Sequence, residues 1–159
     1  VIFLLRPYHI NLGSRIVKSP KVYFTDIGLV NYLTGNKSKT AFTRGAQAGA
    51  IFENFVIQEL LKHYFNRGLT PPLYYYRTNN GLEIDIIIEE KAGVIRPCEI
   101  KLTKTPNSNM VNSIERLRDF GKSKNFSIRD GSVISLVDES FPLTKTARAY
   151  NSKEFLAVI

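Results

Sequence analysis

Charged side chains interrupt two apolar, strand-like segments between residues 81 and 104. The first segment carries Glu83 and Asp85 among isoleucines, and the second carries Glu99 and Lys101. Side chains alternate between the two faces of a strand, so Glu83 and Asp85 share one face, as do Glu99 and Lys101. A tight turn joins the segments, and we therefore expect the two polar faces to lie next to each other.

This arrangement predicts a particular chemistry. Neighbouring carboxylates repel, and each costs several kcal/mol when it is buried without a partner. A divalent cation removes the conflict, and carboxylate oxygens suit Mg2+ or Mn2+. The Lys101 ammonium could orient a water or stabilise charge on a phosphate oxygen. Asp85, Glu99 and Lys101 are therefore candidates for metal-dependent phosphodiester hydrolysis. They could equally form a cross-strand ion pair on a solvated sheet face that also includes Glu83 and Glu89.

Strict alternation along the first segment also assigns the isoleucines. It puts Ile87 on the face of Asp85, and it puts Ile84, Ile86 and Ile88 on the opposite face.

The surrounding elements must position these side chains. Apolar residues at spacings of three and four predict a helix over residues 49–65, with Glu53 near its start. Glu53 could be there simply because the helix dipole favours a carboxylate near the start of a helix. Strands are predicted at 73–77, 83–89 and 94–102, where short connections favour an antiparallel meander. A helix near 110–120, a strand at 132–137, and a short strand and helix capped at Asn151 or Ser152 follow.

The first residues of the chain predict a hairpin. Residues 1–8 and 21–26 are strand-like, and Asp26 can cap a short helix that runs through Leu33. The complete order predicts an α/β or α+β fold with a mixed sheet flanked by helices.

Composition limits the possible functions. The 159 residues carry a net charge of +8, which favours a polyanionic partner such as DNA. Cys98 is the single cysteine, so no internal disulfide forms; a reducing, cytoplasmic location and a core position for this residue are expected. No apolar run approaches the ~18 residues of a membrane span, and no phosphate-binding P-loop occurs. Candidate contacts to a nucleic-acid backbone are Lys37, Lys39, Arg44, Lys104 and Lys122.

A family resemblance appears at these residues. An acid on the first helix, then Asp, then Glu-x-Lys resembles the PD-(D/E)xK nuclease superfamily, whose restriction-endonuclease-like core has the order αβββαβ. Four blocks are similar to the DUF4143 domain, which ends a family of archaeal and bacterial AAA-type ATPases. They read KSPKVYFTDIGLVNYLTG, GAIFENFVIQELL, YYYRTNNGLEIDIII and PCEIKLTKTP.

The resemblance implies a role for four residues. Glu53 matches the helix acid, Asp85 and Glu99 match the metal ligands that Glu53 assists, and Lys101 matches the catalytic lysine. The chain departs from the motif at Ile84, where the superfamily name has Pro.

The resemblance also implies a domain division. Residues 1–44 would be the remnant of a winged-helix segment, a partial hairpin, plus a linker helix, and residues 45–159 the nuclease-like domain. The chain would then be a fragment of a longer protein, in which an upstream ATPase module binds ATP.

The expected function is Mg2+-dependent hydrolysis of DNA by this domain. The alternative is a catalytically inactive DNA- or protein-binding module that serves the ATPase. A purely structural or antitoxin-like interaction domain is a third possibility, and the sequence leaves the oligomeric state open.

Overall fold

One mixed sheet forms the framework of the molecule. The computed structural model describes residues 1–9, 19–35, 45–122 and 127–159. The strands are β1 (Ile2–Pro7), β2 (Lys21–Phe24), β3 (Leu73–Arg77), β4 (Glu83–Lys91), β5 (Val94–Ile100), β6 (Ser127–Ile128), β7 (Gly131–Ser135), β8 (Phe141–Thr144) and β9 (Ala147–Asn151). The helices are α1 (Ile27–Leu33), α3 (Ala48–Phe65), the 3-10 turn η1 (Ser108–Val111), α4 (Asn112–Gly121) and α5 (Ser152–Ala157).

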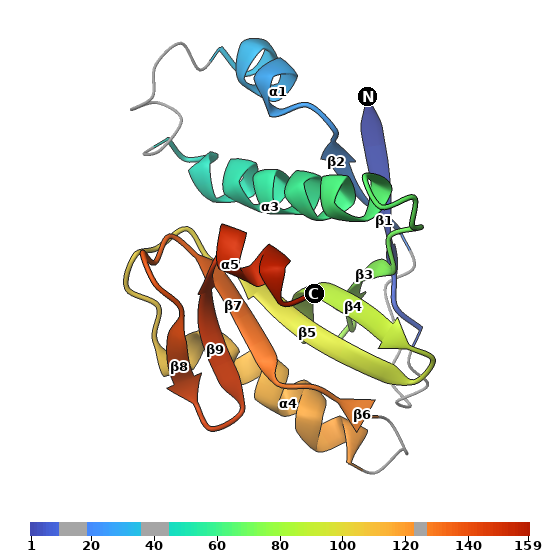
Figure 1. Ribbon diagram of the computed structural model, residues 1–159, viewed down its shortest axis with the longest axis vertical. Helices are drawn as coiled ribbons and strands as arrows, with labels where there is room; N and C mark the ends of the chain where they lie inside the picture. Colours follow the sequence, from blue (N-terminus) through green and yellow to red (C-terminus); the bar gives the residue numbers. More distant parts are fainter. Residues whose placement is uncertain (10–18, 36–44, 123–126) are drawn as a thin grey trace.

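The strands follow the order β2-β1-β3-β4-β5-β7-β9-β8, and β6 pairs with β5. The β1–β3, β5–β7 and β7–β9 pairs are parallel, whereas β3–β4 and β4–β5 are antiparallel. Helices α3 and α5 lie on one side of the sheet and α4 on the other (Figure 1). The predicted mixed α+β sheet with flanking helices and its meander are therefore confirmed.

Each face of the sheet buries its own hydrophobic core. On the α3 side, Ile57 and Leu60 are fully buried in one cluster with Ile86 and Cys98. On the other side, the α4 residues Ile114 and Leu117 pack with the central strands. Complete burial of such a side chain contributes about 1.5–3 kcal/mol. The sheet is therefore covered on both faces, and Cys98 is a core residue as predicted.

The long helix α3 follows from the spacing of its apolar residues. Its buried stripe includes Ile51, Val56, Ile57, Leu60 and Leu61. The helix ends at Phe65, and Gly68 beyond it adopts a left-handed conformation with φ 69°. None of the helices in the described part of the chain is both long and apolar enough to span a membrane.

A bulge in β4 corrects the predicted alternation. Opposite the single residue Tyr75 of β3, strand β4 has two residues, Asp85 and Ile86, where the pairing register shifts. As a result, Ile84 and Ile87 pack on the α4 side, whereas Ile86 packs on the α3 side. The prediction that Ile84 shares a face with Ile86 and Ile88 is therefore wrong, since Ile88 also packs on the α3 side.

Two strands were not predicted. Strand β8 contains Pro142 and lies at the edge of the sheet, where a residue without a backbone N–H is tolerated. Strand β6 has only two residues. The predicted final helix is present, and the Asn151 side chain caps it by accepting a hydrogen bond from the Lys153 N–H at 2.9 Å.

The β1–β2 hairpin joins the same sheet through the parallel pairing of β1 with β3. Leu5 and Tyr23 contribute to the core on the α3 side. Asn54 of α3 holds the outer strand, because its Oδ1 accepts from the Phe24 N–H at 2.8 Å and its Nδ2 donates to the Phe24 carbonyl at 2.7 Å. The proposed division between residues 44 and 45 stays a prediction.

Asn54→Ala should destabilise the protein by about 1–3 kcal/mol, because it removes both hydrogen bonds to a largely buried edge. Urea unfolding measures this change. Asn54→Asp keeps the acceptor for the Phe24 N–H but turns a carboxylate oxygen towards the Phe24 carbonyl in a largely buried place, so it should destabilise the protein at least as much as Ala. An Ala variant as stable as the wild type would show that this clamp does not hold β2.

Candidate functional site

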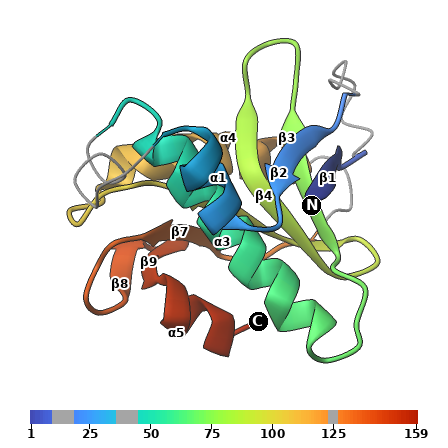
Figure 2. The same ribbon diagram turned by 90° about the horizontal axis from the view of Figure 1, so that it is seen from above.

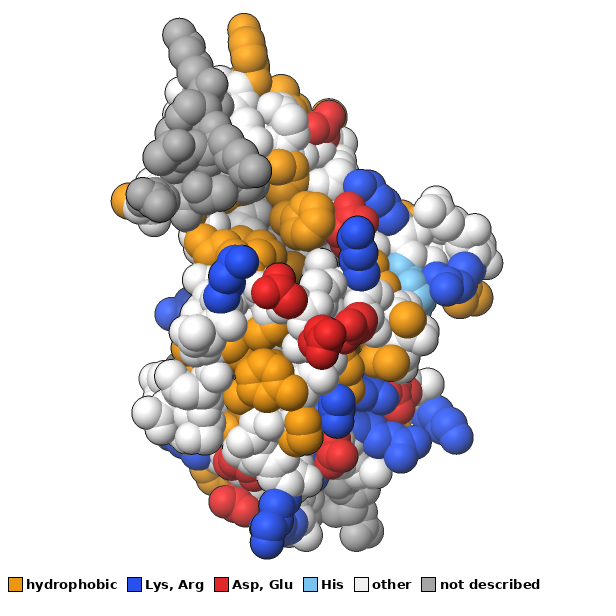
Figure 3. Space-filling view, turned by 60° about the vertical axis from the view of Figure 1, so that its left-hand side comes forward, with side chains coloured by type: hydrophobic (Ala, Val, Ile, Leu, Met, Phe, Trp, Pro, Cys, Tyr) orange, Lys and Arg blue, Asp and Glu red, His pale blue; other side chains and the backbone are white. Residues whose placement is uncertain are grey.

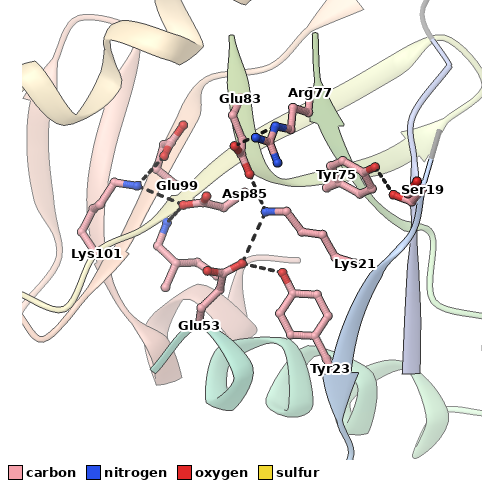
Figure 4. A network of polar contacts seen from close by, with 11 residues as sticks. Ser19, Lys21, Tyr23, Glu53, Tyr75, Arg77, Glu83, Asp85, Glu99 and Lys101 are labelled. Atoms are coloured by element: carbon pink, nitrogen blue, oxygen red, sulfur yellow. Dashed lines mark hydrogen bonds and ion pairs between the residues drawn. The ribbon is translucent and has the colours of Figure 1, made fainter. Parts of the chain in front are cut away.

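A lysine joins two carboxylates where β4 and β5 separate. Lys101 Nζ lies 3.0 Å from Asp85 Oδ2 and 2.6 Å from Glu99 Oε2 (Figure 4). Asp85 belongs to the bulge of β4, Glu99 lies near the end of β5, and Lys101 directly follows that strand. Three of the four predicted site residues are thus brought together.

The backbone explains why Asp85 can enter the cluster. Among the described residues, the β4–β5 register ends at the pair Ile86↔Cys98. Beyond this pair, the Ile100 N–H donates to Asp85 Oδ2 at 2.8 Å, so a carboxylate replaces a backbone acceptor. The Lys101 N–H donates to the β7 carbonyl of Ile134 at 3.0 Å. The chain after β5 therefore follows β7, and Asp85 occupies the gap that this leaves.

Glu99 is a buried acid with an oxygen that lacks a partner. The residue is only 4% exposed, and its Oε1 has no hydrogen-bond partner in the described structure. Burial, and then the charge of Asp85, raise the pKa of Glu99 to about 8, although Lys101 partly opposes the rise. One oxygen of this carboxyl therefore contacts Lys101, and the other is left as an unused acceptor position among the described residues.

Lys101 remains an ammonium in this setting. Burial lowers its pKa, but the Asp85 and Glu99 carboxylates outweigh that effect, and the net direction is upward. Its side chain is 35% exposed, which leaves it accessible from solvent. A positive charge that solvent can reach is thus fixed beside the two acids.

The fourth predicted residue, Glu53, belongs to a second network beside the first. It accepts a hydrogen bond from the Tyr23 hydroxyl, and Lys21 Nζ lies 3.6 Å from its Oε1. The same Lys21 Nζ lies 2.7 Å from Glu83 Oε1, and Arg77 Nε lies 3.5 Å from Glu83 Oε2. Figure 4 shows the two networks side by side, with Asp85 next to the second. Glu53 is therefore more than an acid favoured by the helix dipole, since the hairpin binds it.

Lys21 and Tyr23 were not predicted to belong to the site. They are two residues apart on β2, so both side chains point to the face that meets α3. The spacing of two residues on a predicted strand was the signal in the sequence that could have placed Lys21 and Tyr23 on the same face. Burial lowers the pKa of Lys21, but the hydrogen bond to Glu83 and the charges of Glu53, Glu83 and Asp85 raise it overall.

A divalent cation fits part of this arrangement. The oxygen-only donor set of Asp85 and Glu99 suits Mg2+ or Mn2+, and Glu99 Oε1 is a buried acceptor to which no described residue donates. In the described residues, however, no three Asp, Glu, His or Cys side chains are grouped so that they could hold an ion. The two acids of the first network are thus the residues that fit, and Lys21 and Tyr23 hold the predicted third ligand, Glu53.

Other predicted charges lie elsewhere. Glu89 does not share the site's face, because it accepts a hydrogen bond at 2.7 Å from Tyr8, a residue of the α4-side core. Lys104 is exposed beyond β5, and Lys122 is exposed and pairs with Asp119 at 2.8 Å. Lys37, Lys39 and Arg44 lie outside the described residues.

The fold and the site define an α+β domain with a lysine-bridged pair of carboxylates at a break in its sheet. The family model described as "Domain of unknown function (DUF4143)" matches residues 48–155, and the chain belongs to this family, as predicted. A second model, "Domain of unknown function (DUF8612)", matches residues 1–40.

Two mycobacterial proteins are similar to the chain. They are "Uncharacterized protein Rv2008c" of Mycobacterium tuberculosis and "Uncharacterized protein Mb2031c" of Mycobacterium bovis. Each is 38% identical over 108 residues, which cover 67% of this chain and 23% of the relative. The match therefore spans less than a quarter of either relative. No solved structure matches the chain significantly.

The raised pKa of Glu99 predicts how stability depends on pH. The folded protein holds a proton at Glu99 up to a pKa of about 8, whereas the unfolded chain releases it near the ordinary value of 4.5. The stabilising effect of this proton is complete below pH 4.5 and is lost as the pH rises towards 8. Without divalent metal, the wild type should therefore lose more stability than Glu99→Gln between pH 5 and about 8. Urea unfolding in EDTA across this range tests the expectation, and parallel profiles for the two proteins would contradict it.

Proposed function

We propose that this domain hydrolyses phosphodiester bonds of DNA in a reaction that depends on a divalent cation. One observation carries the proposal: Lys101 bridges Asp85 and Glu99, and a buried oxygen of Glu99 has no partner among the residues that the structure describes. Carboxylates that bind a cation and an adjacent ammonium are the groups that this reaction uses. The restriction-endonuclease-like fold belongs to the same proposal, supported by the element order α3-β3-β4-β5-η1-α4-β6-β7, in which only the short elements η1 and β6 are additional to αβββαβ.

Each residue has a role that its position allows. Asp85 and Glu99 would hold the ion, and Glu53 is the candidate third ligand. When bound there, Mg2+ or Mn2+ would supply a Lewis acid for the phosphate and lower the pKa of a bound water. Lys101, with its partly exposed ammonium, would orient the attacking water or donate to a phosphate oxygen. The Ile100 N–H fixes Asp85 through a hydrogen bond of 2.8 Å, so the carboxylate is oriented before any ligand arrives.

The proposed substrate is DNA because the net charge of +8 favours a polyanion. Figure 3 shows acidic side chains grouped on one face with Lys and Arg side chains beside them, so positive charge accompanies negative charge there. The upstream ATPase module, which would bind ATP, and a cytoplasmic location complete the proposal.

A binding module without catalysis is the second candidate. It is favoured by Lys101 itself, which already compensates Asp85 and Glu99 at 3.0 Å and 2.6 Å without a metal ion. Such a module would present its basic residues to DNA or to a protein partner and would keep the acids as a structural ion cluster.

A cleavage assay separates the candidates. The protein is incubated with plasmid and oligonucleotide DNA in Mg2+ or Mn2+, and wild type is compared with Asp85→Ala, Glu99→Gln and Lys101→Ala. Catalysis predicts that each variant loses at least about 100-fold of the rate, because each removes an ion ligand or the group that stabilises charge.

Asp119→Asn is the matched control for that assay. It removes an exposed carboxylate on α4, away from the site, and should cleave at the wild-type rate. If the wild type binds DNA but none of these proteins cleaves it, the binding module is the correct function.

DNA binding itself can be measured in EDTA, where cleavage stops. Lys104→Ala should weaken binding to all sequences alike and reduce the slope of log affinity against log salt by about one, as expected for one lost phosphate contact. Fluorescence anisotropy over a salt series measures both quantities. An unchanged slope would show that Lys104 contacts no phosphate.

A further inference from the structure

The β1–β2 hairpin places a positive charge, that of Lys21, beside the acidic side chains of the site. The four predicted site residues belong to other parts of the chain, namely α3, β4 and the end of β5. Lys21 Nζ lies between two carboxylates, 2.7 Å from Glu83 and 3.6 Å from Glu53, and its side chain is 23% exposed. It also lies 5.4 Å from the centre of the Tyr75 ring. These contacts hold the ammonium in one place, so it is a fixed part of the site.

Tyr23 acts on the same acid from the same strand. Its hydroxyl donates to Glu53, which is therefore held by two side chains of β2. Asn54, the next residue of α3, binds the backbone of β2 at Phe24. The position of β2 and the position of the Glu53 carboxylate are thus linked through three side chains on two elements.

We propose that Lys21 is a positioning residue that holds Glu53 in place of a divalent cation, so that the β1–β2 hairpin sets the cation affinity of the site. In the described arrangement Glu53 is engaged by the hairpin, and no group of three acids is arranged to hold an ion. Beside it, the Asp85–Glu99 pair retains the buried Glu99 Oε1, which has no partner in the described ranges. Release of Glu53 from Lys21 provides the third carboxylate for this pair.

Electrostatics determines the direction of the effect. An ammonium beside carboxylates lowers the negative potential that attracts a cation, and the effect is larger in a partly buried place than in water. The charges of Glu53, Glu83 and Asp85 all act on Lys21. Removing the charge of Lys21 therefore makes the acidic side chains more attractive to a divalent ion and leaves Glu53 held by the Tyr23 hydroxyl alone.

Mn2+ binding tests this inference without nucleic acid. In calorimetric titrations at neutral pH, Lys21→Met should bind Mn2+ about tenfold more tightly than the wild type, because a nearby like charge is lost. The gain should disappear in the double variant Lys21→Met/Glu53→Gln, since Glu53 is the ligand that Lys21 releases. Lys21→Arg keeps the charge and should bind as the wild type does.

Lys62→Met is the matched control for net charge. It removes an exposed ammonium on the same helix as Glu53, where Lys62 pairs with Glu59, and it should leave the affinity unchanged. Urea unfolding verifies that each variant is folded. If Lys21→Met does not fold, Lys21→Gln, which can still donate to Glu83, takes its place with the same expected gain.

The possible outcomes separate this inference from the proposed function on which it rests. A gain that depends on Glu53 supports the role of Lys21 even when no DNA is cleaved. Equal or weaker binding by the Lys21 variants overturns it, as does a gain that persists without Glu53. Absence of Mn2+ binding in every protein overturns it as well. If the wild type cleaves DNA but Lys21→Met gains no Mn2+ affinity, this inference fails and the proposed function stands.

Discussion

Repulsion between Asp85 and Glu99 is the constraint around which this end of the sheet is organised. The two carboxylates lie where β4 and β5 separate, and Glu99 is only 4% exposed to solvent. Lys101 between them makes the arrangement possible, since removal of a positive partner leaves buried charge uncompensated. Protonation of Glu99 up to a pKa of about 8 is the second means of compensation. A cation would be a third.

The fold creates the gap between β4 and β5 in a simple way. The bulge at Asp85 and Ile86 puts an additional residue into β4, and the β4–β5 pairing ends at the same bulge, with the pair Ile86↔Cys98. Beyond it, the chain after β5 follows β7 instead (Figure 2). An edge that would otherwise have an unpaired N–H at Ile100 receives the Asp85 carboxylate. The acid therefore replaces a strand partner, which explains how a charged residue is tolerated among isoleucines.

The parts of this structure that sequence could predict are those with strong local patterns. The stripe of α3 and the closely spaced strands β3, β4 and β5 are local, and so the meander and the meeting of Asp85, Glu99 and Lys101 followed from periodicity and spacing. The bulge did not, because nothing in a run of isoleucines marks the position of the additional residue. Lys21 was missed because the parallel pairing of β1 with β3 joins segments far apart in the chain. Strand β8 was missed because Pro142 argues against a strand.

A structural ion cluster alone explains this site poorly. Buried ion pairs contribute little net stability unless their remaining lone pairs are satisfied, and well-packed apolar residues often serve as well or better. Within the described part of the chain, Glu99 Oε1 is buried and has no partner, and a buried acceptor left unpaired costs free energy. Isoleucine at this position would complete the apolar pattern of β5 without that penalty. The same reasoning extends to Glu53 and Glu83, whose negative charges are compensated by Lys21 of the hairpin. Acids that are costly to keep, arranged beside two partly exposed lysines, are what the proposed cation site would require.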